Sequence, residues 1–253
     1  MLDPTKRFSN RVADYIKYRP GYPAAVIESL ERECALRPGS VIADIGAGTG
    51  IFSDLWLSRG HRVIGVEPNA EMREAGVRLL HDRPGYRAVE GTAEATTLDA
   101  ASVDLVSAAQ AFHWFKRDPA RAEFARILKP GGGVAIIWNE RQTTTTPFLA
   151  AYEKLLKTFA TDYEAVNHMN LDPATVSSFF GPGGCERVVF PNRQVFDFAG
   201  LKGRLLSSSY APEPGHPRHE PMLAALREIF DQFNARGQVA FEYDTSVYCG
   251  RLS

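Results

Sequence analysis

The chain has 253 residues, of which 44% are hydrophobic and 23% charged, and this predicts one globular domain or one domain with an elaborated cap. Its formal net charge of −1 at pH 7 lacks the basic excess typical of a nucleic-acid-binding protein, so we expect no nucleic-acid partner. No stretch of the sequence is long and apolar enough to span a bilayer, so we expect no membrane partner.

In chain order, strands alternate with helices through the first 140 residues, which is the pattern of a doubly wound parallel sheet. The predicted strands in this part cover residues 41–45, 62–67, 86–90, 103–109 and 133–138. The predicted helices cover residues 22–36, 51–59, 70–80 and 118–128. The remainder predicts helices over 146–159, 172–180, 201–209 and 219–236, with strand-like alternation over 185–198 and 239–252.

The first predicted strand, Val41–Ile45, runs directly into three alternating glycines, Gly46, Gly48 and Gly50. Glycine adopts backbone conformations closed to other residues and lets a ligand approach the backbone closely. Because the following residues are predicted to be helical, the glycines lie at a strand-to-helix turn, where a helix N-terminus can meet a cofactor. The alternative interpretation is a packed turn with no ligand.

The glycine spacing differs from the dinucleotide-binding fingerprint G-x-G-x-x-G/A, which requires glycine or alanine at position 51 when it begins at Gly46. Ile51 stands there, and the run is instead Asp44-x-Gly46-x-Gly48-x-Gly50. The second predicted strand ends in Glu67, at the place where a carboxylate can bind ribose hydroxyl groups. A nicotinamide-dependent oxidoreductase stays open as an alternative, although Ile51 and the lack of a Ser/Tyr-x-x-x-Lys set disfavour it.

This D-x-G-x-G-x-G run, with a following strand that ends in Glu67, resembles the class I S-adenosylmethionine-dependent methyltransferases of the type 11 kind. The resemblance implies an α/β fold with a Rossmann-like, doubly wound and mostly parallel sheet of seven strands and a helical cap. It implies S-adenosylmethionine as the cofactor, and it places the last two strands at residues 185–191 and 241–251. The helices between the fifth strand and the last strands would form a lid over the substrate. We therefore expect residues 1–38 to form an N-terminal helical segment over the cofactor, residues 39–142 the cofactor-binding core, and residues 143–253 the helical lid plus the last strands.

The resemblance continues after the third predicted strand, at Glu90-Gly-Thr-Ala-Glu94. Family members often carry an Asp there that hydrogen-bonds the adenine amino group. Thr92 takes that position in this chain, which leaves the adenine contact to the Ala93 backbone or to the Glu94 side chain.

Further motifs extend the resemblance toward a subgroup. Ser102–Gln110 resembles the fourth-strand motif and puts Gln110 near the methionine part of the cofactor, and Arg126–Gly132 resembles the R-x-L-K-P-G-G turn. Ala109–Phe115 contains an A-x-H-W segment similar to that of trans-aconitate methyltransferases. In this segment His113 follows a strand's carboxyl end, the edge where α/β sheets bind ligands. His113 is either a general base or only a hydrogen-bonding partner of Gln110 or of the backbone.

The N-terminal pattern Phe8-Ser-x5-Tyr15-x3-Arg19-Pro-x-Tyr-Pro23 resembles the leading helix of the same subgroup. In that arrangement Tyr15 or Arg19 would lie near the methionine carboxylate, which a guanidinium binds through paired hydrogen bonds. The alternative is an exposed arm with an ordinary surface arginine. Taken together, the expected cofactor contacts are Tyr15, Arg19, Asp44, Gly46, Ala47, Gly48, Gly50, Glu67, Pro68, Thr92, Ala93 and Gln110.

The implied reaction transfers a methyl group from a sulfonium to a nucleophile of a small molecule, so the protein mainly aligns donor and acceptor. A carboxylate acceptor needs cationic or hydrogen-bonding partners and no base, whereas an amine or phenol favours a base such as His113. The subgroup resemblance favours an oxygen acceptor, for which the orienting candidates are Arg11, Arg19, Arg141, Arg204 and Ser207–Tyr210. The residues expected to contact the substrate are His113, Trp114, Arg141 and Tyr210, with His113 as the catalytic candidate. A third hypothesis is a non-catalytic protein that binds S-adenosylmethionine.

Three cysteines, Cys34, Cys185 and Cys249, are scattered along the chain without a CxxC pair. Such a set predicts reduced thiols in a cytoplasmic protein and neither disulfides nor a metal site. The first residues also lack the apolar core of a signal peptide, which favours the same compartment. The sequence leaves the oligomeric state open.

Overall fold

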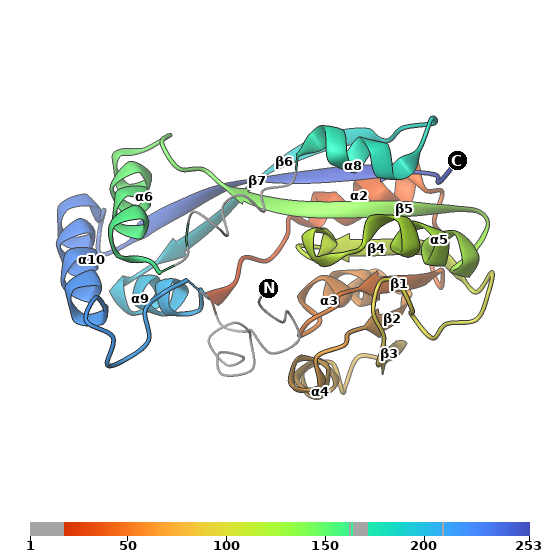
Figure 1. Ribbon diagram of the computed structural model, residues 1–253, viewed down its shortest axis with the longest axis horizontal. Coiled ribbons are helices and arrows are strands. Elements are labelled where there is room, and N and C mark those ends of the chain that lie inside the picture. Colours follow the sequence, from red (N-terminus) through yellow and green to blue (C-terminus); the bar gives the residue numbers. More distant parts are fainter. Residues whose placement is uncertain (1–17, 162, 164–171, 209) are drawn as a thin grey trace.

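The computed structural model describes residues 18–161, 163, 172–208 and 210–253. Within this part of the chain, seven strands form one sheet in the order β3-β2-β1-β4-β5-β7-β6 (Figure 1). The strands are β1 Val41–Ile45, β2 Arg62–Val66, β3 Tyr86–Val89, β4 Val103–Ala109, β5 Leu128–Arg141, β6 Glu186–Phe196 and β7 Val239–Gly250. The first five pair in parallel, and β7 runs antiparallel to both β5 and β6. The predicted doubly wound, mostly parallel sheet of seven strands with a helical cap is confirmed.

The helices begin where the sequence offers suitable caps. Asn69 accepts a hydrogen bond from the Met72 N–H at the start of one helix, and Thr146 does the same for Leu149 at another, where Pro147 takes the first helical position. The helices are α2 Ala24–Glu33, α3 Ile51–Ser58, α4 Ala70–Leu79, α5 Arg117–Ile127, α6 Pro147–Phe159, α8 Pro173–Phe180, α9 Phe198–Leu206 and α10 His219–Phe233, with a short 3-10 turn at Phe112–Trp114. None of the described helices is both long and apolar enough to cross a membrane.

Helices cover both faces of the sheet, and the strands are therefore nearly continuous runs of hydrophobic residues. On one face, α2 and α3 bury residues such as Ile27 and Trp56 against the sheet. On the other face, α5 and α8 bury Phe124 and Phe180. The helices on both faces fix the carboxyl ends of the parallel strands, where the glycine turn lies.

The strands β5, β6 and β7 are long enough to pass beyond the parallel sheet. The pairing of β5 with β4 ends at Ile137, while β5 continues to pair with β7 as far as Arg141. The first residues of β7, 239–242, lie beyond the end of β5 and pair only with β6. Helices α6, α9 and α10, which we call the lid, pack around this extension at one end of the molecule (Figure 1). Their apolar side chains form a second core with Phe241.

Strand β5 differs from the predicted strand over 133–138. It begins at Leu128 because the Lys129–Gly132 segment stays in the sheet as a bulge, at which the register against β4 shifts between Val103 and Leu105. Gly131 makes this possible with a φ of 81°, in the left-handed region that glycine favours.

Helix α8 also differs from the expectation that the helices after β5 belong to the lid. Val176, Phe179 and Phe180 pack against α5 and the sheet, so this helix covers a face of the core. Its periodicity predicts a helix, but it does not tell which core the helix joins.

Candidate active site

A cavity of about 970 Å³ begins at the glycine turn and continues to the lid. We call the part lined by Gly46–Gly48, Glu67 and Gln110 the turn half, and the part lined by Arg141 and Arg204 the lid half. Strand β5 contributes to both halves, because its extension carries the wall from the sheet to the lid.

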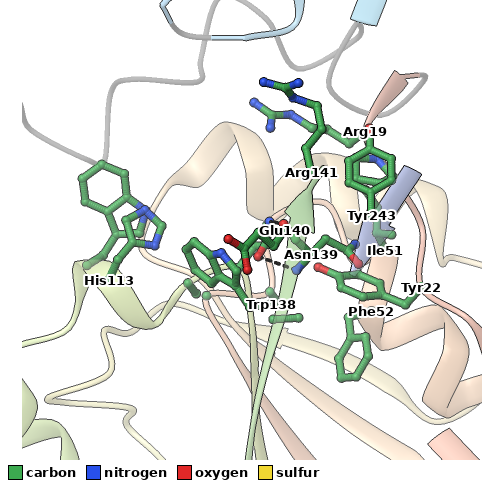
Figure 2. A pocket seen from close by; sticks show the side chains of 18 of the residues that line it. Arg19, Tyr22, Ile51, Phe52, His113, Trp138, Asn139, Glu140, Arg141 and Tyr243 are labelled. Atoms are coloured by element: carbon green, nitrogen blue, oxygen red, sulfur yellow. Dashed lines mark hydrogen bonds between the residues drawn. The ribbon is translucent and has the colours of Figure 1, made fainter. Parts of the chain in front are cut away.

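In the view of Figure 2, His113 and Trp138 lie on one side of the cavity, while Arg19, Arg141 and Tyr243 gather on the other. These side chains come from the N-terminal segment, the 3-10 turn, β5 and β7. Aromatic groups and cations therefore face a common space although their residues are far apart in the sequence.

The glycine turn brings the backbone close to the cavity but uses its own donors within the protein. The N–H groups of Gly46 and Ala47 donate to the Val66 carbonyl at 2.9 and 3.2 Å. Gly46 has a φ of 69°, and a Cβ added there would lie 2.6 Å from the Ala111 Cβ. Gly50 is the one predicted contact among the described residues that does not line the cavity. It caps α3 with a φ of 85°.

Glu67 is held in a fixed orientation at the end of β2. Its Oε2 accepts a hydrogen bond from the Gly48 N–H at 2.9 Å, and its Oε1 accepts one from the Asn69 N–H at 2.9 Å. Burial raises the pKa of Glu67, against these two backbone hydrogen bonds, which lower it. Each carboxylate oxygen keeps a free lone-pair direction, so the group can accept further hydrogen bonds from a ligand.

Asp44 supports the turn from below. Its carboxylate is 1% exposed and accepts hydrogen bonds from the hydroxyls of Ser53 at 2.6 Å and Ser107 at 3.0 Å. Burial raises the pKa of Asp44 to about 6. Because Ser53 lies on α3 and Ser107 on β4, this acid ties three elements together beneath the cavity.

Gln110 also has its side chain bound within the protein. Its amide donates to the Asn139 carbonyl at 3.1 Å and accepts from the Asn139 N–H at 3.0 Å. The residue adopts a φ of 55°, in the left-handed region that residues other than glycine rarely adopt. Such a conformation indicates a functional or packing role for the residue. The predicted cofactor contacts Pro68, Thr92 and Ala93 line the same half of the cavity.

The N-terminal segment reaches the cavity through residues 18–22. Arg19 lines the cavity and donates from Nη2 to the Ser207 carbonyl at 3.3 Å. The Gly21 carbonyl accepts from Asn139 Nδ2 at 3.1 Å, which fixes this segment against β5. Tyr15, the other predicted contact in this region, lies outside the described residues, as does Arg11.

His113 lies on the 3-10 turn and faces the cavity between two indole rings. Its ring centroid is 4.5 Å from that of Trp114 and 5.1 Å from that of Trp138. Two further aromatic residues, Phe115 and Tyr210, line the cavity, while Phe112, Phe148 and Tyr152 are buried in the two cores.

Arg141 enters the lid half from the end of β5. Its Nη2 donates to Glu153 Oε2 at 2.6 Å and to the Tyr163 hydroxyl at 3.0 Å. Glu153 is 9% exposed in its side chain, so this is a buried ion pair whose net charge is close to zero. The predicted substrate contacts His113, Trp114, Arg141 and Tyr210 all line the cavity.

Arg204 is the second lid-half arginine and differs in its pairing. It is 7% exposed, and its Nη1 donates to the Ser208 hydroxyl at 3.1 Å. Within the described part of the chain, no carboxylate pairs with it, and its Nε has no hydrogen-bond partner. Burial disfavours its charged form, but the surrounding tyrosine hydroxyls, foremost that of Tyr243, raise the pKa of Arg204.

Several lining residues were not predicted from the sequence: Tyr22, Asn69, Met72, Glu140, Glu153, Tyr163 and Tyr243. Alternation along residues 239–252 could have put Tyr243 on one face of a strand, but not over this cavity. Tyr163 and Glu153 carry no local signal, because only the tertiary fold brings them to Arg141.

The fold and this cavity define an α/β protein of the class I, S-adenosylmethionine-dependent methyltransferase type. Residues 43–136 match the model of the family described as a methyltransferase domain. A methyltransferase-like protein of Schizosaccharomyces pombe is 35% identical over 225 residues, which cover 88% of this chain and 86% of that protein. The chain therefore belongs to the methyltransferase family, and S-adenosylmethionine is its methyl donor.

Solved structures agree on the fold. A structure from Anaeromyxobacter dehalogenans, described as a type II methyltransferase, has a TM-score of 0.70 at 23% identity and covers 93% of this chain and 98% of its own. A methyltransferase from Geobacter sulfurreducens, solved with S-adenosyl-L-homocysteine, has a TM-score of 0.50 at 16% identity, with 98% of each chain covered. Family membership decides against the nicotinamide-dependent alternative.

Proposed function

We propose that this enzyme methylates a carboxylate of a small molecule, with the methyl donor in the turn half of the cavity and the acceptor in the lid half. The observation that carries the proposal is Arg204, a buried cation without a carboxylate partner among the described residues, in the same cavity as the glycine turn. A buried charge is costly unless it is paired, and the carboxylate of a bound acceptor would supply the pair.

The turn half suits S-adenosylmethionine in its polar groups. Glu67 is half-buried and already oriented by two backbone N–H groups, so its carboxylate can accept hydrogen bonds from the two ribose hydroxyls without reorganising. Hydrogen bonds from those hydroxyls would offset the burial that raises its pKa. The fit therefore rests on the preoriented carboxylate of Glu67, which accepts hydrogen bonds beside a turn that leaves room for a ligand at its backbone.

The other roles follow the lining of the turn half. Thr92, Ala93 and Pro68 would surround the adenine, while Arg19 and Gln110 lie where the methionine part would extend toward the lid. Gly46, Ala47 and Gly48 would contact the donor through their backbone atoms, and Asp44 would hold their turn in place. The donor supplies a methyl group that is activated by a positively charged sulfur.

The lid half would bind and orient the acceptor. Arg204 would bind a carboxylate of the acceptor, and Tyr243 and Tyr210 line the cavity beside it. A carboxylate is a nucleophile without losing a proton, so the side chains need only align it and exclude water. The similarity of residues 109–115 to the trans-aconitate methyltransferase subgroup supports the same acceptor chemistry.

A second candidate acceptor is an amine or a phenol, and the observation that favours it is His113. This imidazole faces the cavity beside Trp138 and could remove a proton from such a nucleophile. With a carboxylate acceptor, His113 would only contact the substrate together with Trp114.

We further propose that the division of labour follows the chain. Residues 39–142 would bind the donor, residues 143–253 would supply the acceptor half and the last strands, and residues 1–38 would cover the donor. Arg19 and Tyr22, which belong to the N-terminal part and line the cavity, support this division.

The test is a transfer assay with radiolabelled S-adenosylmethionine against pooled metabolites sorted into carboxylates, phenols and amines. We expect label in the carboxylate pool, in a product that releases volatile methanol in mild base because it is a methyl ester. Label only in base-stable products of the amine or phenol pools would overturn the carboxylate proposal and favour His113 as a base.

A further inference from the structure

Two cysteines that are far apart in the sequence meet at the sheet. Cys34 Sγ and Cys249 Sγ lie 2.9 Å apart although 215 positions separate the residues. Both thiols are free and half-buried. The sequence alone suggested scattered, unrelated thiols, because the residues lie near opposite ends of the chain.

The fold brings these thiols together through α2 and β7. Cys34 caps the C-terminus of α2, where its N–H donates to the Leu30 carbonyl at 2.9 Å. Helix α2 packs against one face of the sheet and contacts its strand β7, which lies in front of the helix in Figure 1. Cys249 pairs in the sheet with Ala135 of β5. Both backbones are therefore fixed by regular structure on either side of the contact.

A glycine leaves the room that the thiols occupy. A Cβ added at Gly133 would lie 3.2 Å from Cys34 Sγ, tighter than most such contacts. The two sulfurs need to approach by only about 0.9 Å to reach a disulfide bond length of about 2.05 Å. A movement of this size lies within ordinary side-chain adjustment.

We propose that Cys34 and Cys249 are a redox modification site that forms a disulfide when the protein meets a peroxide or a low-molecular-weight disulfide. The hydrogen bond from Cys249 lowers the pKa of Cys34, which favours Cys34 as the attacking thiolate. The same contact raises the pKa of Cys249. Cys185 lies on the other face of the sheet, and burial raises its pKa, so it is a poorer nucleophile.

The step balances with the oxidant alone. The Cys34 thiolate attacks one oxygen of hydrogen peroxide, which breaks the O–O bond, forms a sulfenic acid and, with one proton, releases water. Cys249 then attacks the sulfenic sulfur, forms the S–S bond and releases the second water. Two thiols and one peroxide thus give one disulfide and two waters. With a low-molecular-weight disulfide, the Cys34 thiolate attacks one sulfur and releases one small thiol, and Cys249 then attacks the mixed disulfide and releases the second.

The disulfide would join α2 to β7 and close a loop of 215 positions, so it would restrict the unfolded chain strongly. We expect the thermal midpoint to rise by several degrees on oxidation. Neither cysteine lines the cavity, so turnover at 25 °C should change less than about twofold. The inference therefore does not depend on the proposed acceptor.

The experiment treats the full chain with hydrogen peroxide, or separately with oxidised glutathione, and then maps peptides by mass spectrometry without reduction. We expect a peptide pair linked through Cys34 and Cys249, a loss of two hydrogens, and a fall from three titratable thiols to one. The thermal midpoint should rise in the wild type and in Cys185→Ser, and it should stay unchanged in Cys34→Ser and Cys249→Ser. Because the peptide map uses the wild-type chain, it decides the question even if a serine variant fails to fold. Three thiols remaining, a link through Cys185, or Cys34 carrying only glutathione or a higher oxide would overturn the proposal.

Discussion

In the turn half of the cavity Asp44, Glu67 and Gln110 are already hydrogen-bonded within the protein, whereas in the lid half Arg204 has no carboxylate partner among the described residues. Asp44 binds two serines, Glu67 binds two backbone N–H groups, and Gln110 binds the Asn139 backbone. Arg204 donates to the Ser208 hydroxyl and lies beside tyrosine hydroxyls, but no carboxylate pairs with it in the described part of the chain. A site for a constant ligand can therefore be completed by the fold, while a site for a particular substrate keeps a charge for that substrate to satisfy.

The largest expected effect comes from removing the charge of Arg204, which no carboxylate pairs among the described residues. Arg204→Met should lower kcat/KM for the acceptor roughly 100-fold, which corresponds to a loss of about 3 kcal/mol in transition-state binding. The affinity for S-adenosylmethionine should stay unchanged. Steady-state kinetics and titration calorimetry would measure the two effects. The matched control is Lys202→Met, an exposed cation of the same helix, which should change neither. A parallel loss of donor affinity would show that the two halves are not separate.

The next effect concerns Asp44, which supports the glycine turn, and it is a pH dependence of the free energy of unfolding. The pKa of Asp44 is about 6 in the folded protein and about 3.9 in an unfolded chain, so the folded state binds this proton more tightly. The contribution of Asp44 is therefore most favourable below about pH 4 and is lost as the pH rises through about 6, by roughly 2–3 kcal/mol.

Urea unfolding between pH 4 and pH 8 would measure this slope. Asp44→Asn should flatten the curve relative to the wild type, whereas Asp99→Asn, at an exposed position, should not. Identical slopes for the wild type and Asp44→Asn would contradict the assignment of the shift to Asp44.

A somewhat smaller effect should follow from replacing the preoriented carboxylate of Glu67 in the turn half. Glu67→Gln should weaken S-adenosylmethionine binding by about 2 kcal/mol, because an amide cannot accept hydrogen bonds at both ends. Titration calorimetry would detect the loss, and Glu71→Gln, on the exposed side of α4, serves as control. Unchanged affinity would remove Glu67 from the donor site.

The smallest effect is expected at His113, on the border of the two halves. If the acceptor is a carboxylate, His113→Gln should lower kcat less than about 10-fold, because no proton needs to be removed. A loss of about 100-fold or more that falls mainly on kcat would be the result expected of a general base. Phe115→Leu, a neighbouring change in the cavity lining, controls for lost packing.

The sequence predicted the turn half better than the lid half for a physical reason. The strand, the turn and Glu67 lie within 27 residues, and their glycine spacing and β-branched residues act locally. The lid half joins Arg141, Glu153 and Tyr243, which come from β5, α6 and β7. Glu153 and Tyr243 lie in predicted elements and Arg141 lies beyond the predicted strand over 133–138. Periodicity gives a side chain's face and not its distant partner.

Other differences have the same origin. The Lys129–Gly132 segment has the composition of a turn, and it stays in the sheet as a bulge because Leu128 and Gly133 on either side of it pair with β4. Helix α8 was predicted as a helix, but its contacts with α5 could not be predicted from its own residues. Likewise, the proximity of Cys34 to Cys249 depends on the packing of α2 beside β7.

The continuity of β5, β6 and β7 from the sheet into the lid has a consequence for engineering new specificities. A lid joined by a flexible linker can be exchanged at the linker, but here the junction runs through the middle of three hydrogen-bonded strands. A chimaera would have to be spliced near Ile137 in β5 and at the matching registers of β6 and β7, with their ladder preserved. Transplanting substrate choice between such enzymes therefore becomes a problem of joining strand registers, not of choosing loops.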